Sequence, residues 1–435
     1  MSRTTRTSRV SRERPHGVRS AAFRRLSWAW AVSMCGDGAR AVALPLYVTV
    51  HSHAPLAVAA VATAETLPWL LGALPAGALV DRLPPRTVLV VAHALRAVAT
   101  AGLVAVLTAG APSVAVLCAF AFVLTALELF ADPASQVMMV RLARPDELEA
   151  ANSRFYSIST VATGLVGPLA GSALFAVGPV WAFALDGLTF VVSAGLTATL
   201  PAPGGPAATA GPRRPRVRSE MAEGARLLLG HPELRALVVL VAAAGLAVSA
   251  VNTLLPLYAV DQLAFGPRAV GLVVTVFGVA ALLGAVLAAR LPARVGGARA
   301  MISGMAAAGA AFTAFALFPR PAVLWLGCAL AGTGLGLWNV LCSSRRQRLT
   351  PPAVLGRVSG VYRMLAWGLN PVGSALAGIA AAATTVRAPL LLAGVLVLAV
   401  LAALAPVLRR EQNSSPDMST CPPDAKQLAD VPSSW

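Results

Sequence analysis

The chain has 435 residues, of which 57% are apolar and only 12% are charged. Its apolar runs repeatedly exceed the roughly 20 residues that span a bilayer, so the composition indicates an all-α protein that crosses a membrane many times. The net charge of +17 does not indicate a nucleic-acid partner, because the arginines are scattered between the apolar runs and do not form one basic block.

The chemically reactive residues argue against an enzyme or an ATP-driven pump. The single lysine, Lys426, lies in the polar carboxy-terminal stretch, so the chain has no Walker A loop that could bind ATP. Neither an H-E-x-x-H nor a G-x-S-x-G pattern occurs, and the five cysteines lie far apart without a C-x-x-C pair. We therefore expect no catalytic residue, no metal and no cofactor. The energy for any work that the chain does must then come from elsewhere.

The apolar runs predict twelve membrane-spanning helices in two halves of six. An arginine-rich stretch, residues 1–25, is predicted to be a disordered cytoplasmic tail, and so is the polar stretch 409–435. The halves, residues 26–200 and 234–408, flank a linker at 201–233 that ends in an amphipathic helical run. The predicted segments are residues 26–49, 57–80, 86–109, 113–140, 151–177, 179–200, 234–259, 268–289, 299–318, 321–343, 357–383 and 387–408.

The arginines between these segments predict the orientation of the chain. Every second connection, beginning with the one that holds Arg82 and Arg86, is rich in arginine, whereas the alternate connections hold little beyond Arg268, Arg320 and Arg387. Loops rich in Lys and Arg remain on the cytoplasmic side. We therefore expect a multi-pass protein of the cell membrane with both termini in the cytoplasm.

Two short patterns recur about half a chain apart. Gly77 to Arg86 reads GALVDRLPPR, and Gly284 to Arg294 reads GAVLAARLPAR. The tetrapeptide LPLY occurs at Leu44–Tyr47 and again at Leu255–Tyr258. A duplicated membrane unit accounts for both echoes.

These motifs resemble the major facilitator superfamily, and within it the drug and siderophore exporters similar to the enterobactin and macrolide efflux proteins. Gly77, Asp81, Arg82 and Arg86 match the superfamily's signature in the loop between helices 2 and 3, although Pro84 and Pro85 replace its usual glycine and basic residue. Further stretches similar to this branch are Gly36-Asp37, Ala151-Asn152, His231-Pro232-x-Leu234-Arg235, and Arg346-Gln347 through Gly356-Arg357-Val358.

The resemblance implies a two-half, twelve-helix transporter that works by alternating access. Gly164, Gly167, Pro168 and Gly171 in helix 5 resemble a pattern associated with antiporters, which favours export. The arginine that many proton antiporters carry in helix 4 has no counterpart. We expect a monomeric proton-coupled antiporter that exports a small, largely apolar molecule. The alternative is a proton-coupled importer of a small nutrient or organic ion.

Charged residues within the apolar segments are the candidates for proton coupling. Asp37 lies midway along helix 1, and Glu128 and Asp132 lie one turn apart in helix 4. A charge at the bilayer centre costs about 2.5–3.5 kcal/mol, so we expect these carboxyl groups to face water or a partner. The alternative is purely structural, with Asp37 paired to Arg40 and a helix 4 acid paired to Arg96.

We expect the other polar residues within the predicted segments to have structural roles or to contact the substrate. Glu65 and Asp186 are expected to cap or pack, and His93 to support the counter-charge at Arg96. The second half has no acid within its predicted membrane-spanning segments. Its candidates for orienting an apolar substrate, with helix packing as the alternative, are Asn252, Trp338, Asn339, Trp367 and Asn370.

The helix 2–3 loop generates the first prediction. Asp81 lies where it can meet the positively charged start of helix 11 around Arg357, and this contact would latch the cytoplasmic side of the outward-open state. Asp81→Asn should therefore shift the population toward the inward-open state. Labelling of single cysteines on both faces measures the shift, and unchanged accessibility on both faces would contradict the latch.

Overall fold

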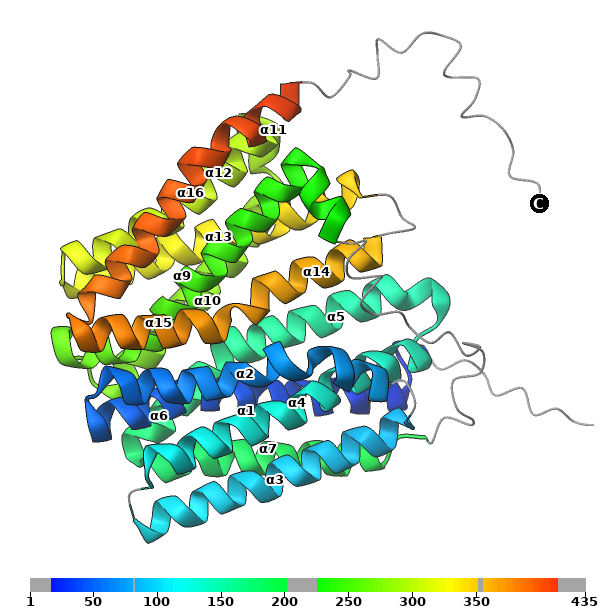
Figure 1. Ribbon diagram of the computed structural model, residues 1–435. Coiled ribbons are helices and arrows are strands. Elements are labelled where there is room, and N and C mark those ends of the chain that lie inside the picture. Colours follow the sequence, from blue (N-terminus) through cyan, green and yellow to red (C-terminus); the bar gives the residue numbers. More distant parts are fainter. Residues whose placement is uncertain (1–16, 81–82, 111, 202–224, 351–354, 414–435) are drawn as a thin grey trace, which may run out of the picture. The chain divides into compact units, whose positions relative to one another are not determined.

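A computed structural model describes residues 17–80, 83–110, 112–201, 225–350 and 355–413 (Figure 1). All regular elements in these ranges are helical. They are α1 (Ala21–Ser52), α2 (Pro55–Val80), α3 (Pro85–Ala109), α4 (Val114–Leu142), η1 (Pro145–Glu147), α5 (Leu148–Val161), η2 (Ala162–Val166), α6 (Gly167–Val177), α7 (Pro179–Ala198), α9 (Pro232–Leu263), α10 (Pro267–Leu287), α11 (Leu291–Val295), α12 (Gly297–Leu317), α13 (Pro321–Leu349), α14 (Leu355–Gly368), α15 (Asn370–Ala383) and α16 (Arg387–Asn413).

The predicted all-α membrane architecture is confirmed. Eleven helical stretches within the described ranges are long and apolar enough to cross a membrane, and they correspond to the second to twelfth predicted segments. The first segment corresponds to α1, which has 32 residues but carries Asp37 and Arg40 near its middle. These two charges lower the hydropathy of α1, which explains why length and composition alone do not mark it as a span.

Helix ends and breaks refine the predicted boundaries. α1 begins at Ala21, inside the predicted tail, because the Ser20 hydroxyl accepts a hydrogen bond from the Phe23 backbone N–H and caps the helix. α16 continues to Asn413, past the predicted end at 408. Predicted helix 11 is divided into α14 and α15 just before Pro371, and predicted helix 5 contains a π-helical turn, η2. Most of both predicted tails, and residues 202–224 of the predicted 201–233 linker, lie outside the described residues.

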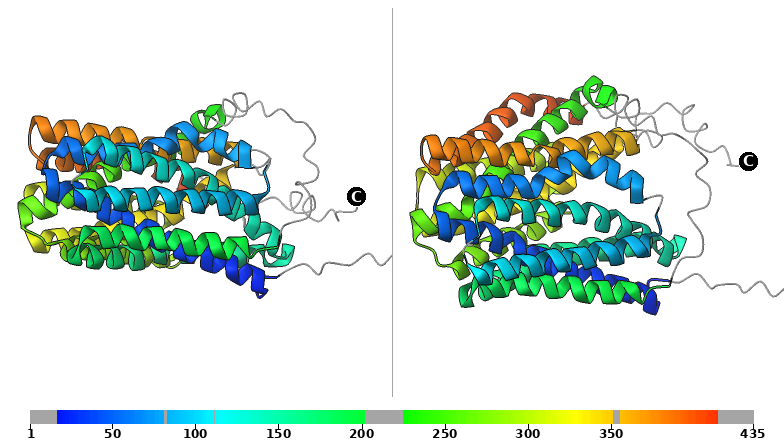
Figure 2. Two further views of the ribbon diagram at one scale, coloured as in Figure 1. Left: turned by 90° about the horizontal axis from the view of Figure 1, so that it is seen from below. Right: turned by 60° about the horizontal axis from the view of Figure 1, so that its bottom comes forward.

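The described helices group into two compact units. The first contains the described residues of Met1–Arg213 together with Leu255–Gly278, and the second those of Arg214–Leu254 together with Val279–Trp435. In the first unit, α7 packs against α1 and α3, while α4 packs against α2 and α3 (Figures 1 and 2). In the second, α12 packs against both α13 and α16.

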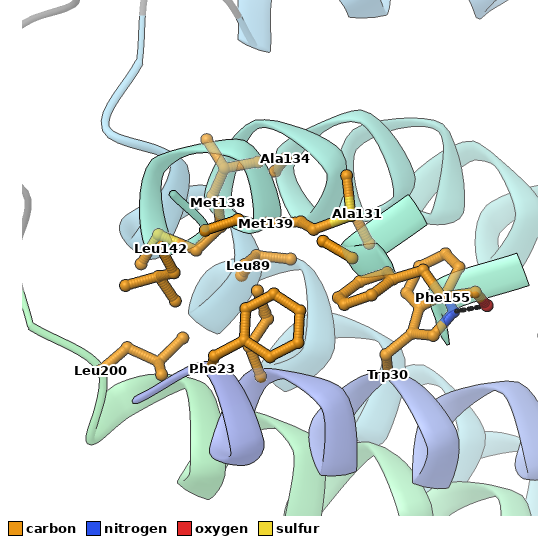
Figure 3. Close-up of a cluster of buried hydrophobic side chains, with 14 of the residues drawn as sticks. Phe23, Trp30, Leu89, Ala131, Ala134, Met138, Met139, Leu142, Phe155 and Leu200 are labelled. Carbon is orange, nitrogen blue, oxygen red and sulfur yellow. Dashed lines mark hydrogen bonds between the residues drawn. The ribbon is translucent and has the colours of Figure 1, made fainter. Parts of the chain in front are cut away.

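A cluster of large apolar side chains fixes the amino-terminal part of α1 in the first unit. Phe23 and Trp30 face Phe155 of α5, and Trp30 stacks on it with ring centroids 5.5 Å apart (Figure 3). The Trp30 indole N–H also donates to the Phe155 carbonyl over 3.3 Å, which satisfies its only polar group. Leu89 and Met138, from α3 and α4, complete the cluster. This contact sets the position of the next two turns of α1, which carry the charges.

Small residues allow α1 to approach its neighbours closely. A Cβ atom on Gly171 of α6 would lie 2.6 Å from the Ala39 backbone, and one on Gly167 would lie 2.7 Å from the Gly38 Cα. A Cβ on Gly36 would lie 2.6 Å from the Asp186 carboxylate of α7. The Gly-x-x-Gly-Pro stretch is therefore the packing surface between α6 and α1.

This close packing predicts the effect of adding one methyl group. Gly171→Ala should lower the free energy of unfolding by about 1–3 kcal/mol, because backbone on both sides of the contact must move. Gly195→Ala is the matched control, since a Cβ there meets no atom within 4 Å. Thermal unfolding of the purified protein in detergent measures both, and equal midpoints would contradict the packing role.

Candidate functional site

Two buried arginines and four carboxyl groups meet in the interior of the first unit. Asp37 and Arg40 come from α1, Glu65 from α2, Arg96 from α3, Glu128 from α4 and Asp186 from α7. We call these six residues the charge cluster. Five helices contribute to it, so the cluster ties together most of the unit.

Arg40 is the centre of the charge cluster. Its Nη1 donates to Glu65 Oε1 over 2.6 Å and its Nη2 to Asp37 Oδ1 over 3.3 Å. Its Nη2 also lies 3.6 Å from Glu128 Oε2, and its Nε lies 3.7 Å from Asp186 Oδ2. Because only 4% of the side chain is exposed, these carboxyl groups replace water as its partners.

Arg96 makes a second set of contacts to two of the same acids. Its Nη2 donates to Asp37 Oδ1 and lies 3.5 Å from Glu128 Oε2. The guanidinium stacks 4.0 Å from the centroid of the Phe190 ring, which is a cation–π contact from α7. Asp37 and Glu128 are therefore shared between both arginines, so a change in the charge of either acid acts on both.

Asp132 adds a fifth acid next to the charge cluster. It lies one turn after Glu128 in α4, and no arginine in the described part of the chain lies within ion-pair distance of it. Its Oδ1 atom is buried and accepts no hydrogen bond from a described residue. Two guanidinium groups thus face five carboxyl groups, so the arginines alone leave the site with an excess of acid.

The structure brings together most of the residues predicted for coupling. Asp37, Glu128, Arg40 and Arg96 are in direct contact, and both ion pairs of the structural alternative are present. The expectation for Glu65 and Asp186 is wrong in part, because neither caps a helix and both reach Arg40. The signal that identified Asp37, an acid in the interior of an apolar helix, also applied to them.

His93 packs beside the charge cluster without joining it. Its ring stacks on Phe190 at a centroid distance of 6.3 Å, one turn before Arg96. Its Nδ1 is buried and has no hydrogen-bond partner among the described residues. Together with the cation–π contact, this stacking fixes the direction in which Arg96 points.

The predicted substrate residues of the second unit occupy different surroundings. Asn252, Asn339 and Trp367 are exposed, and 63% of Trp367 is accessible. Trp338 is buried in α13 with 1% of its surface accessible, which is a packing position. The Asn370 carbonyl accepts a hydrogen bond from the Ser249 hydroxyl over 2.6 Å, so this residue joins α15 to α9 through its backbone.

The helix 2–3 hairpin is described only at its edges. Gly77 lies within α2, whereas Asp81 and Arg82 lie outside the described residues. Arg86 donates to the Ala198 carbonyl at the end of α7. A cation there stabilises the negative end of the helix dipole, so Arg86 anchors α3 to α7.

No group of three or more His, Cys, Asp or Glu side chains among the described residues has a geometry that could hold a metal ion.

Residues 26–369 match the Major Facilitator Superfamily, and this match covers more than half of the chain. The chain belongs to the Major Facilitator Superfamily. Among curated proteins, the Multidrug efflux pump Tap of Mycolicibacterium fortuitum is 30% identical over 387 residues, which covers 86% of this chain and 93% of that protein. The Multidrug efflux pump Tap of Mycobacterium tuberculosis (strain H37Rv) is 29% identical over 367 residues, covering 81% and 85%.

Solved structures of this superfamily share the fold. The nucleoside transporter NupG superimposes with a TM-score of 0.73 at 14% identity, covering 90% of this chain and all of NupG. A bacterial homologue of the iron transporter ferroportin, in an inward-facing state, gives a TM-score of 0.69 at 19% identity, covering 90% and 100%. At these identities the likeness shows the fold alone.

The contacts of Arg40 predict a large effect of its removal. Arg40→Gln leaves four carboxyl groups without their shared cation, so we expect a loss of about 3–5 kcal/mol in unfolding free energy at neutral pH. Acidification should reduce this loss, because protonated carboxyl groups need no counter-ion. The exposed Arg144→Gln is the control, and thermal unfolding at pH 5 and pH 7.5 measures both. A loss that does not change with pH would contradict the electrostatic explanation.

Proposed function

We propose that this protein is a proton-coupled exporter of small, largely apolar compounds in the cell membrane, with both termini in the cytoplasm. The observation that carries the proposal is the charge cluster together with the adjacent Asp132, which places five acids around two arginines in the interior of the first unit. The similarity to efflux pumps of the Tap type supports export as the direction. In this proposal the protein moves its substrate across the membrane and does not change it chemically.

The excess of acid is the argument for protons. Uncompensated carboxylates in a low-dielectric interior are expensive, and two guanidinium groups balance only two of them. A proton is the smallest cation that can neutralise the others, and it does so without the octahedral or larger coordination shell that a metal ion requires. The number of bound protons then changes whenever the access of water to the site changes.

Asp37 links the protonation of the site to the packing of the helices. Its Oδ1 accepts from both Arg40 and Arg96, so a proton on this carboxyl group weakens two attachments at once. Arg40 is then held more strongly by Glu65 of α2, which is 2.6 Å away. Protonation therefore transfers Arg40 from a partner within α1 to partners on neighbouring helices, and this exchange couples charge to helix movement.

The direct contact of α6 with α1 places the glycine pattern next to the same site. Gly167 and Gly171 face Gly38 and Ala39, the residues between Asp37 and Arg40. The backbones of α1 and α6 are in direct contact here, with no flexible side chain between them. A shift of α1 therefore moves α6 as well. The antiporter-like pattern and the charge cluster act as one mechanical element in this proposal.

The energetics suffice for export. One proton that moves inward across ~100 mV releases about 2.3 kcal/mol, which supports a substrate gradient of roughly fifty-fold. In the second unit, exposed amide and indole groups at Asn252, Asn339 and Trp367 can orient an apolar ligand without fixing its charge.

The test compares two carboxyl groups that differ in their contacts. Asp37→Asn should retain exchange of a fluorescent apolar dye down its gradient and lose uphill efflux driven by a pH gradient in inverted vesicles. Asp132→Asn should reduce the proton-to-dye ratio and keep the α1 contacts intact. Asp146→Asn, at an exposed position, is the control.

The alternative of a fixed ion pair makes a different prediction for the same variant. If Asp37 only holds the bundle together, Asp37→Asn should reduce insertion, exchange and uphill efflux in parallel. Uphill efflux at the unaltered rate in Asp37→Asn would transfer the coupling role to Glu128 or Asp132.

A further inference from the structure

A cavity at one end of the second unit is not part of the charge cluster. It has a volume of about 460 Å³, within the range of small-ligand sites. It is lined by the start of α9, by Ala288 and Ala289 just after α10, by Pro292 of α11, by the start of α12 and by the last turns of α13 and α16. Figure 1 shows α11 beside the adjoining ends of α12 and α16. Its apolar walls include Met301, Val340, Leu341 and Leu408.

The polar groups of the cavity are arranged around an arginine. Arg345 Nε donates to Glu233 Oε1 over 2.5 Å and its Nη2 to Glu233 Oε2 over 3.0 Å. Glu233 is buried, with 3% of its side chain exposed, whereas 24% of Arg345 is exposed. This bidentate pair fixes the plane of the guanidinium at the wall of the cavity.

The cavity has more positive than negative charge. Arg348, three residues after Arg345 on α13, also lines it and is exposed, and no carboxylate in the described part of the chain pairs with it. Three further arginines lie exposed in the adjoining stretch: Arg290 after α10, Arg294 in α11 and Arg299 in the first turn of α12. Among the described residues that line the cavity, Glu233 is the only acid, and it forms an ion pair with Arg345.

The start of α12 adds a directed positive potential. Gly297 and Ala298 in its first turn line the cavity, and this first turn contains no acid. The amino-terminal end of a 21-residue helix carries a partial positive charge and favours an anion. The cavity is therefore lined by three positively charged features: the exposed Arg348, the guanidinium of Arg345 and the amino-terminal end of α12.

We propose that this cavity binds the phosphate group of an anionic phospholipid headgroup. The cavity lies where membrane-spanning helices end, so a lipid in the adjacent leaflet can reach it laterally. Apolar walls suit the glycerol and the first acyl carbons, while Arg348 and the start of α12 face the phosphate. Basic pockets between helices at the cytoplasmic surface have this chemistry, and the anionic lipids of that leaflet supply the ligand. The site is independent of the proposed proton coupling.

The experiment measures the binding of short-chain dioctanoyl phosphatidylglycerol to the purified full-length protein in neutral detergent. Dioctanoyl phosphatidylcholine and inorganic phosphate are the comparison ligands. We expect the phosphatidylglycerol to bind and Arg348→Gln to weaken it about fivefold, as expected for about 1 kcal/mol per basic residue near a headgroup. Arg320→Gln, at the opposite end of α13 and also exposed, should bind as tightly as the unaltered protein.

A second variant tests whether binding requires the cavity itself or only the positive charge around it. Ala289→Trp retains every charge and fills the space, at a position that is itself exposed. It should weaken phosphatidylglycerol binding at least as much as Arg348→Gln. If Ala289→Trp binds normally, the lipid is attracted only to the basic surface and the proposal is wrong.

The comparison ligands decide the source of the phosphate. Arg348-dependent binding of phosphatidylglycerol without measurable binding of inorganic phosphate supports the lipid. Equal Arg348-dependent binding of inorganic phosphate would overturn the lipid assignment in favour of a soluble phosphate compound. Phosphatidylcholine that binds as tightly as phosphatidylglycerol would overturn the role of the anionic headgroup.

Discussion

The Arg40 guanidinium is the constraint on which the first unit depends. A cation in the middle of an apolar helix requires carboxylate partners, and the partners must come from several helices because one helix presents too few positions around it. Asp37, Glu65, Glu128 and Asp186 meet this need from α1, α2, α4 and α7. The positions of four helices are therefore set by one side chain, and Arg96 extends the same network to α3.

Backbone packing makes this arrangement possible. α1 has glycine at positions 36 and 38, on either side of Asp37, and these glycines bring α7 and α6 close enough for short side chains to reach across. A side chain at either position would meet atoms of the neighbouring helix and force the helices apart, which would lengthen the contacts of Arg40. The glycines and the charged residues therefore depend on each other. The glycines let the helices approach closely, and this close approach brings the carboxyl groups within ion-pair distance of Arg40.

The second unit is organised differently. Its interior joins α9 to α15 through hydroxyl groups, with the Ser249 and Ser374 side chains 2.8 Å apart and Thr253 donating to Ser374 over 2.9 Å. Its main ion pair, Glu233 with Arg345, lies at the ends of helices. Neutral polar contacts therefore join the helices in the interior of this unit, whereas its arginines Arg290, Arg294, Arg299 and Arg348 lie exposed.

The sequence by itself determined the class, the helices and the family of this protein. Twenty-residue apolar runs admit only membrane helices, and the motifs from Gly36 to Val358 identify the superfamily, because both signals are local in the chain. It also identified Asp37, Arg40, Arg96 and Glu128, since a charge in an apolar run stands out without a structure. Only the tertiary structure decided their partners. Glu65 and Asp186 joined Arg40, and Glu233 joined Arg345, because ion pairs depend on distances between helices that spacing along one helix does not encode.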